Sequence, residues 1–323
     1  MTRATAFAPG SVGNVGPGFD VLGLAIDGIG DTATVILHDG PAQVESITGR
    51  DAELVPRDPQ LNAAVIAAIA FLRAHGDNRN PLVAIEKGLP LSGGLGGSAA
   101  SSVAGAYAAA RAMGIDDPKP VEIIAAALEG EAAVAGRHLD NIAASVLGGL
   151  TISRSVDPLD AVAVAVKEPW WVAVVTPNVR IRTKDARSIL PMEWERANWV
   201  QQMANTAALT YAFASGDGDL VRRSLDDRYA EPRRASLIPH FHDVKRAAVL
   251  AGAFGCSISG SGPTVFAIAE NEEVANKCAT AMQHAFGEVK STAYHGPIAL
   301  RGVRTSRPHS ADEDVRTPPR RNL

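Results

Sequence analysis

Apolar positions in the first half of the chain fall into two kinds of segment. Residues 31–38 and 82–86 are short and rich in β-branched side chains, which predicts strands. Longer alanine-rich segments predict helices, each followed by a break such as Gly76 or residues 114–118. The helices predicted in this half span 61–74, 98–113 and 120–135.

The second half mixes strands and helices, and more of its residues are expected in helices than in strands. A turn into a strand is expected at 147–152, and strands are expected at 161–166, 170–176 and 265–269. Helices are expected at about 193–215, 217–228, 241–252 and 272–285. Residues 136–145 predict a break, and residues 177–191 predict a polar connection long enough to be functional. Because strands and helices are mixed along the chain, with helical residues in excess in the later part, the expected fold class is α+β.

The composition is that of an ordinary globular protein. The chain has 323 residues, 46% hydrophobic and 20% charged, so a sizeable buried core is expected. A formal net charge of −4 gives no reason to expect nucleic acid or a membrane surface as a partner. The two cysteines, Cys256 and Cys278, lack the spacing of a metal site or disulfide framework. No signal peptide and no apolar run of about 18 residues is found, so a cytoplasmic location is expected.

The glycine-rich segment 90–102 (PLSGGLGGSAASS) carries the clearest chemical signal. Its clustered glycines let backbone N–H groups converge, and the helix that follows adds the positive end of its dipole, so phosphate is the ligand that fits best. It is not a Walker A loop, because no lysine follows the glycines. A dinucleotide-binding turn is disfavoured because residues 88–91 interrupt the preceding strand. A flexible linker would not normally precede candidate capping hydroxyls at Ser98, Ser101 and Ser102.

Two further segments have the same character. Residues 8–23 and 252–266 are dense in glycine, punctuated by proline and followed by apolar, strand-like residues. Either one alone predicts only a tight turn. Three such segments, at the start, in the first third and near the end of the chain, predict the walls of one nucleotide site.

Together these segments resemble the GHMP kinases, the family of galactokinase, homoserine kinase, mevalonate kinase and phosphomevalonate kinase. The matching motifs lie at 14–20 (NVGPGFD), 90–100 (PLSGGLGGSAA) and 259–264 (SGSGPT), in the family's order, and the resemblance covers residues 3–303. It implies a two-domain α+β fold with nucleotide between the domains. The first, residues 1–165, would be an ATP-binding domain like ribosomal protein S5 domain 2, and the second, residues 166–303, would be ferredoxin-like. The tail 304–323 lies outside the resemblance and is expected to be disordered.

Four stretches are similar to the branch of this family that phosphorylates L-homoserine, namely 16–23, 138–141, 183–191 and 226–239. This similarity implies ATP-dependent phosphorylation of the side-chain hydroxyl of L-homoserine to O-phospho-L-homoserine, in threonine biosynthesis, with Mg²⁺ as cofactor. It also allows a homodimer. Departures at Gly10, Val12 and Gly13, and one extra residue before His138, affect loop details rather than the assignment. The alternatives are a GHMP kinase with a mevalonate- or sugar-type acceptor, and a catalytically silent sensor of the same fold.

For the amino-acid substrate, the resemblance implies a site made of Asn14, Asp20, Thr183, Arg187, Arg234 and Gly260. Asp20 would pair with the ammonium group, shared with Asn14. Arg187 and Arg234 would bind the carboxylate, because a guanidinium group matches it with two parallel hydrogen bonds.

For ATP, the resemblance implies contacts with Asn62, Pro90, Leu91, Ser92, Gly93, Gly94, Leu95, Gly96, Gly97, Ser98, Ser101 and Ser102. Asn62 would contact adenine, although a helix N-cap is an equally good interpretation of this residue. Mg²⁺ prefers oxygen ligands and keeps several waters. Its implied protein ligands are Ser98 and Glu131, with Glu129 as the alternative carboxylate.

For the reaction, the resemblance places Asn141 against the acceptor hydroxyl, beside Asp140. Related kinases use an aspartate as base, whereas an amide cannot accept a proton. The hypothesis is that Asn141 orients the hydroxyl while Asp140 supports the loop electrostatically, with Asp140 as base the open alternative. His138 is interpreted as a hydrogen-bonding residue of the loop.

Overall fold

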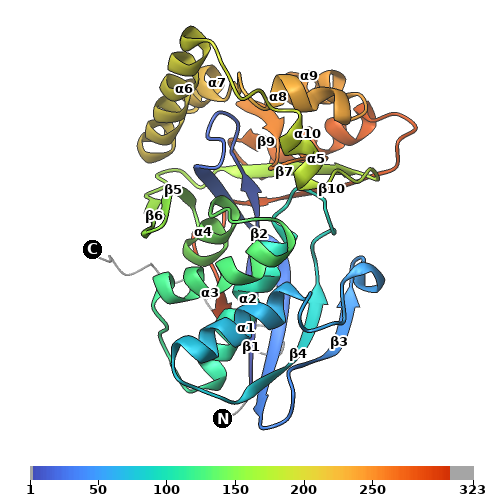
Figure 1. Cartoon of the computed structure of the whole chain (residues 1–323). Helices are drawn as coiled ribbons and strands as arrows, with labels where there is room; N and C mark the ends of the chain where they lie inside the picture. Colours follow the sequence, from blue (N-terminus) through green and yellow to red (C-terminus); the bar gives the residue numbers. More distant parts are fainter. Residues whose placement is uncertain (1–2, 306–323) are drawn as a thin grey trace.

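The chain folds into two parts, each built on one β-sheet, in a computed structural model that describes residues 3–305 (Figure 1). The first sheet has the order β11-β1-β2-β4-β3, with β5 paired to β2 and β6 to β5. Its strands are β1 (Arg3–Gly13), β2 (Leu22–His38), β3 (Gln43–Gly49), β4 (Asn80–Lys87), β5 (Leu150–Val156), β6 (Leu159–Val164) and β11 (Arg304–Thr305). From Asp31 to His38 every second residue of β2 is buried, as expected where one face of a strand is covered.

Helices cover one face of this sheet. They are α1 (Ala63–Ala74), α2 (Gly97–Ala112), α3 (Pro120–Val134) and α4 (Asp140–Leu147). α2 packs on β1 and β2, and α1 and α3 pack on α2. Small side chains make this approach possible: a Cβ on Gly105 would lie 2.3 Å from the carbonyl oxygen of Ala64. The alanine-rich composition of α2 is therefore a consequence of its central, buried place.

The second sheet has the order β10-β7-β9-β8, and all neighbouring strands are antiparallel. Its strands are β7 (Trp171–Pro177), β8 (Gly255–Ile258), β9 (Val265–Ala269) and β10 (Ser291–Pro297). The helices of this part are α5 (Thr183–Ser188), α6 (Arg196–Ser215), α7 (Gly218–Ser224), α8 (Glu231–Arg234), α9 (Phe241–Leu250) and α10 (Glu272–Ala285). Helices between β7 and β8, and α10 between β9 and β10, give the ferredoxin-like order. The expected two-domain α+β fold is confirmed.

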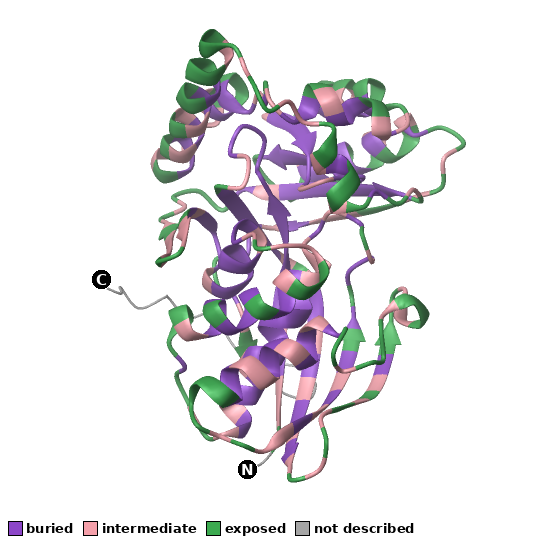
Figure 2. Ribbon diagram, in the orientation of Figure 1, coloured by how far each residue is buried: buried purple, intermediate pink, exposed green. Residues whose placement is uncertain are grey.

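One apolar cluster spans both parts, and the second part has a further buried cluster of its own. Trp170 and Phe213 from the second part belong to the same apolar cluster as the strands of the first, and buried residues run through both parts (Figure 2). The predicted domain limit after residue 165 falls between β6 and β7, and it stays a prediction. After β10 the chain returns to the first sheet, where Ile298 bridges to Ile26 and β11 pairs with β1.

Several sequence expectations need correction. The break predicted at 136–145 is wrong from Asp140 onward, because α4 begins there, and the polar connection 177–191 contains α5. The first glycine-rich segment is strand β1 as far as Gly13, with a register shift at Pro9, the kind of position where a strand tolerates proline. The disordered tail is wrong for Arg304 and Thr305, which form β11, and residues 306–323 lie outside the described residues.

No helix among residues 3–305 is long and apolar enough to cross a membrane.

Candidate active site

A cavity of about 530 Å³ lies where the glycine-rich segments meet α3, α4, α5 and α8. Except for the alternative carboxylate Glu129, the residues predicted for substrate, metal and catalysis all line it, namely Asn14, Asp20, Ser98, Glu131, Asp140, Asn141, Thr183, Arg187, Arg234 and Gly260. Of the predicted ATP contacts, it brings together Asn62, Pro90, Leu91, Ser92, Gly93, Gly94, Gly96, Gly97, Ser98 and Ser101. Leu95 and Ser102 do not line it: Leu95 is buried in the core, and the Ser102 hydroxyl turns to the carbonyl of Ala63 at 3.5 Å.

The glycine loop, residues 90–98, accepts hydrogen bonds from the second domain through its carbonyl groups. The Thr264 backbone N–H donates to the Gly93 carbonyl at 3.2 Å, and the Ser259 hydroxyl donates to the Gly94 carbonyl at 2.5 Å. Gly94 and Gly96 both have left-handed backbone angles, φ 83° and 64°, and Gly96 is the residue from which α2 starts. With these carbonyls bonded away from the cavity, the amino-terminal end of α2 forms its wall, as a phosphate site requires.

A buried ion pair beneath this loop was not foreseen. Lys87 on β4 pairs with Asp31 on β2, and its ammonium group also donates to the Gly97 carbonyl at 3.1 Å and the Ser101 hydroxyl at 2.9 Å. The Asp31 carboxylate accepts from Ser101 as well, at 2.6 Å. These bonds use all three N–H donors of Lys87, so its ammonium group, neutralised by Asp31, fixes Gly97 and Ser101 in the first turn of α2. The cross-strand register that pairs Asp31 with Lys87 could have revealed it, but only once strand pairing was known.

The end of the cavity around Asn62 is apolar. Asn62 is the N-cap of α1, and its side-chain oxygen accepts from the backbone of Ala64 at 3.2 Å and Val65 at 3.3 Å. Its role as N-cap is confirmed, and because it also lines the cavity, its contact with adenine stays a prediction. The apolar neighbours missed by sequence reasoning are Leu54, Val55, Pro56 and Leu61.

At the opposite end, Asp20 and Arg187 pair with each other. The guanidinium group donates two hydrogen bonds to the carboxylate, at 2.8 and 2.9 Å. Asn14 lies below: its amide oxygen accepts from the Asp20 backbone N–H at 3.0 Å, and its amide nitrogen donates to the Gly260 carbonyl at 2.9 Å. Burial and the Arg187 charge lower the pKa of His138, which leaves its ring neutral beside this pair.

Arg234 is a buried cation with only carbonyl partners. It donates to the Gly260 carbonyl at 2.8 Å and the Ala186 carbonyl at 3.1 Å, is 3% exposed, and forms no ion pair within the described part of the chain. Burial, followed by the nearby Arg187 charge, lowers its pKa. The Phe19 ring lies against both guanidinium groups, 5.2 Å from Arg187 and 5.4 Å from Arg234. A buried cation at a cavity wall calls for an anionic ligand.

Asp140 and Asn141 begin α4, between the two ends of the cavity. Burial, followed by the Asp20 charge, raises the pKa of Asp140 to about 6. Its carboxylate accepts from the Asn14 backbone N–H at 3.1 Å, and the Asn141 amide nitrogen lies 3.5 Å from its other oxygen. At neutral pH this carboxylate is therefore mostly ionised and can accept a hydrogen bond or a proton.

Glu131 carries an unsatisfied buried oxygen. Its Oε2 atom has no hydrogen-bond partner among the described residues. Burial raises its pKa to about 7, against the lowering effect of the Ser98 hydroxyl. Glu129, the alternative carboxylate, is exposed, pairs with Arg137 at 3.1 Å and does not line the cavity. A buried carboxylate oxygen without a partner, beside a hydroxyl, fits a divalent cation.

Comparison with protein families agrees with this geometry. The model of the GHMP kinase N-terminal domain matches residues 62–149, and that of the GHMP kinase C-terminal region matches residues 209–288. Fold and site thus define an ATP-dependent kinase of the GHMP class.

Similar proteins narrow the class. Homoserine kinase of Chloroherpeton thalassium is 41% identical, covering 94% of this chain and 99% of its own, and that of Pyrococcus abyssi is 42% identical, covering 88% and 92%. The crystal structure of homoserine kinase from Cytophaga hutchinsonii matches with a TM-score of 0.90 at 38% identity, covering 95% of this chain and 98% of that one. The chain therefore belongs to the homoserine kinases of the GHMP kinase family. L. major mevalonate kinase, at 14% identity and a TM-score of 0.69, shares the fold.

Proposed function

We propose that the protein transfers the terminal phosphoryl group of ATP to the side-chain hydroxyl of L-homoserine, giving O-phospho-L-homoserine for threonine biosynthesis in the cytoplasm. The observation that carries the choice of acceptor is the Asp20–Arg187 ion pair at a cavity wall that also holds the buried cation Arg234. The 38–42% identity to homoserine kinases over most of the chain supports it independently.

A zwitterion can bind between Asp20 and Arg187 and replace the contact between them with one contact to each. The ammonium and carboxylate groups of an amino acid sit on one carbon, so they can enter between Asp20 and Arg187 while both side chains keep a counter-charge. Arg234 would bind the second carboxylate oxygen. Mevalonate brings a carboxylate without an ammonium group and would leave Asp20 uncompensated, and a sugar brings neither charge. The charges at this end therefore favour an amino-acid acceptor over both alternatives.

ATP would lie along the rest of the cavity. The amino-terminal end of α2 and the glycine loop suit its phosphates, and the apolar residues around Asn62 suit adenine. Little covalent chemistry is required of the protein in phosphoryl transfer, so this positioning is the main contribution expected.

Glu131 and Ser98 are the residues that would hold Mg²⁺. An Mg²⁺ ion held by these two residues would take its other ligands from phosphate and water. When bound, Mg²⁺ neutralises charge on the phosphate groups.

The acceptor hydroxyl would lie at Asn141 and Asp140. Asn141 supplies a hydrogen-bond donor and Asp140 an acceptor. Asp140 could take the hydroxyl proton, because its raised pKa makes it a better base than an ordinary aspartate. Replacing Asp140 by Asn decides its role: a loss of turnover beyond about 10³-fold indicates the base.

The test of the function is ADP release in the presence of Mg²⁺, with acceptors that differ by one charge. Homoserine should be phosphorylated. 4-Hydroxybutyrate, which lacks the ammonium group, and 3-aminopropanol, which lacks the carboxylate, should lose at least about 100-fold in kcat/KM. Phosphorylation of mevalonate or galactose in place of homoserine would overturn the choice of acceptor. No acceptor-dependent release at all would indicate the silent sensor.

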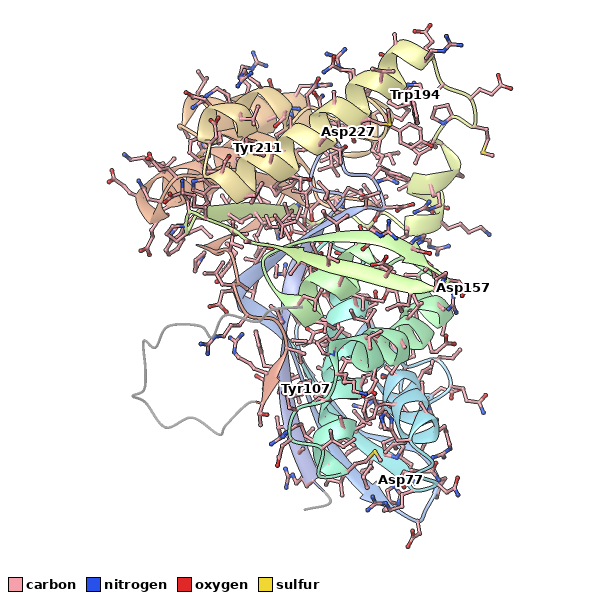
Figure 3. All side chains as sticks on the ribbon, turned by 90° about the vertical axis from the view of Figure 1, so that its left-hand side faces the viewer. Asp77, Tyr107, Asp157, Trp194, Tyr211 and Asp227 are labelled. Atoms are coloured by element: carbon pink, nitrogen blue, oxygen red, sulfur yellow. The ribbon has the colours of Figure 1, made fainter. Side chains whose placement is uncertain are left out.

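We also propose that two copies associate through α6. Trp199, Met203 and Tyr211 on this helix are 52%, 46% and 66% exposed, and α6 contains no charged residue after Arg196. Figure 3 views the molecule from this side, with Tyr211 labelled. A face without charge can meet its own copy without like-charge repulsion. Sedimentation should show a dimer that Trp199→Glu dissociates and that Lys277→Glu, on α10, leaves intact; a monomeric wild type would contradict this.

A further inference from the structure

Ser11 on β1 joins three segments of the site, yet neither the motifs nor the proposed reaction gives it a role. Its side chain is fully buried. The backbone N–H donates to the Leu95 carbonyl of the glycine loop at 3.1 Å, and the hydroxyl donates to the side-chain oxygen of Asn141 at 3.0 Å. Ser11 therefore connects the glycine loop to Asn141, the residue expected at the acceptor hydroxyl.

The hydrogen bond from the Ser11 hydroxyl determines which end of the Asn141 side-chain amide faces the substrate hydroxyl. With Oδ1 accepting from Ser11, the amide nitrogen is directed to the opposite side, where it lies 3.5 Å from Oδ1 of Asp140. The reverse orientation would place two acceptor oxygens, those of Asn141 and the Asp140 carboxylate, against each other. Hydrogen bonding on both sides thus selects the orientation in which Asn141 is a donor.

Two glycines close the space around this pair. A Cβ on Gly96 would lie 2.4 Å from the Ser11 hydroxyl oxygen and 2.9 Å from Oδ1 of Asn141. A Cβ on Gly13 would lie 2.7 Å from the Asn141 amide nitrogen. Because the backbone packs this closely on both sides, the amide has little room to adopt another rotamer.

We propose that Ser11 is a positioning residue that holds Asn141 as a hydrogen-bond donor to the oxygen of the acceptor hydroxyl. The oxygen keeps a lone pair for attack on phosphorus, and its proton remains free to leave toward Asp140 or the phosphoryl group. The link from Ser11 to Leu95 sets the position of this donor relative to the glycine loop. The proposal rests on the proposed phosphoryl transfer to a hydroxyl, and it concerns the rate of that step rather than substrate affinity.

The first test is the kinetics of Ser11→Ala in the full chain. Turnover of homoserine should fall about 10- to 100-fold, while both KM values change less than about threefold, because Asp20, Arg187 and Arg234 are untouched. Ser11→Thr, which keeps the hydroxyl, should restore at least about a third of wild-type turnover. The matched control is Ser145→Ala, which removes another fully buried hydroxyl between α4 and β1, bonded to the Pro9 carbonyl at 2.9 Å, without touching Asn141.

The second test is a double-mutant cycle with Asn141→Ala. If Ser11 acts through Asn141, adding Ser11→Ala to that variant should reduce turnover less than about twofold further. An additive loss, or an equal loss in Ser145→Ala, would show a purely structural role and overturn the proposal. Retention of more than half of wild-type turnover by Ser11→Ala would overturn it as well. Those outcomes leave the proposed function intact, whereas absence of homoserine-dependent turnover in the unaltered chain would overturn both.

Discussion

The two ends of the cavity are built by different means. The wall proposed for the ATP phosphates is a continuous stretch of backbone, residues 90–98, fixed by hydrogen bonds to its carbonyl groups and by glycine conformations. The end proposed for the acceptor carries three charged side chains, Asp20, Arg187 and Arg234, that come from three distant segments. The first end is therefore sensitive to atoms that are added, and the second to charges that are removed.

The largest effect is expected from adding one carbon to the nucleotide end. A Cβ on Gly94 would lie 2.6 Å from the Ser259 carbonyl and 2.9 Å from that of Gly262, at φ 83°. Gly94→Ala should displace the loop and lower kcat/KM for ATP by more than about 100-fold, as misplacement near 1 Å does. Gly114→Ala is the matched control, because Gly114 has φ 91° and nothing within 4 Å of its Cβ position. Equal losses in both variants would assign the effect to backbone strain alone.

At the acceptor end, Arg234→Ala should raise the KM for homoserine without changing the KM for ATP appreciably. Removing a buried partner of a charged ligand typically costs about 2–5 kcal/mol, so the KM for homoserine should rise at least about 30-fold while that for ATP changes less than about threefold. Arg233→Ala, whose side chain bonds to backbone carbonyls outside the cavity, is the control. Similar increases in both KM values would mean that Arg234 supports the fold rather than the carboxylate.

This contrast also explains what could be predicted from the sequence. The glycine loop was found because its residues are adjacent in the chain. The helix predicted at 272–285 is confirmed as α10, and the structure shows that Asn271 caps it. The helix α4 was missed, since it has eight residues and no capping side chain, and packing on β1 and β2 stabilises it. The Asp31–Lys87 pair and the Ser11–Asn141 bond depend on tertiary contacts, which spacing along the chain does not reveal.

A smaller, conditional effect is expected at Glu131, between the two ends. Its raised pKa, from 4.5 to about 7, means that protons and Mg²⁺ compete for it, so the apparent Mg²⁺ affinity should fall as pH is lowered below 7. The same shift stabilises the metal-free fold most below pH 4.5, and this stabilisation is lost as pH rises toward 7. Glu131→Gln should flatten both profiles, measured by Mg²⁺ titration of activity and by thermal melting. The control Glu129→Gln should leave both pH profiles unchanged. An unaltered pH dependence of Mg²⁺ affinity in Glu131→Gln would show that Glu131 is not a metal ligand.

The smallest effect tests whether the acceptor end depends on charge alone. Phe19 lies against the guanidinium groups of Arg187 and Arg234 without carrying a charge, and its ring also packs on Tyr229 at 5.0 Å. A cation–π contact at a partly exposed site contributes about 0.5–1 kcal/mol, so Phe19→Leu should raise the KM for homoserine about two- to fivefold and leave that for ATP unchanged. Phe19→Tyr, which keeps the ring, should restore the wild-type KM. An increase as large as that of Arg234→Ala would show that the ring, and not the buried charge, determines how the carboxylate is held.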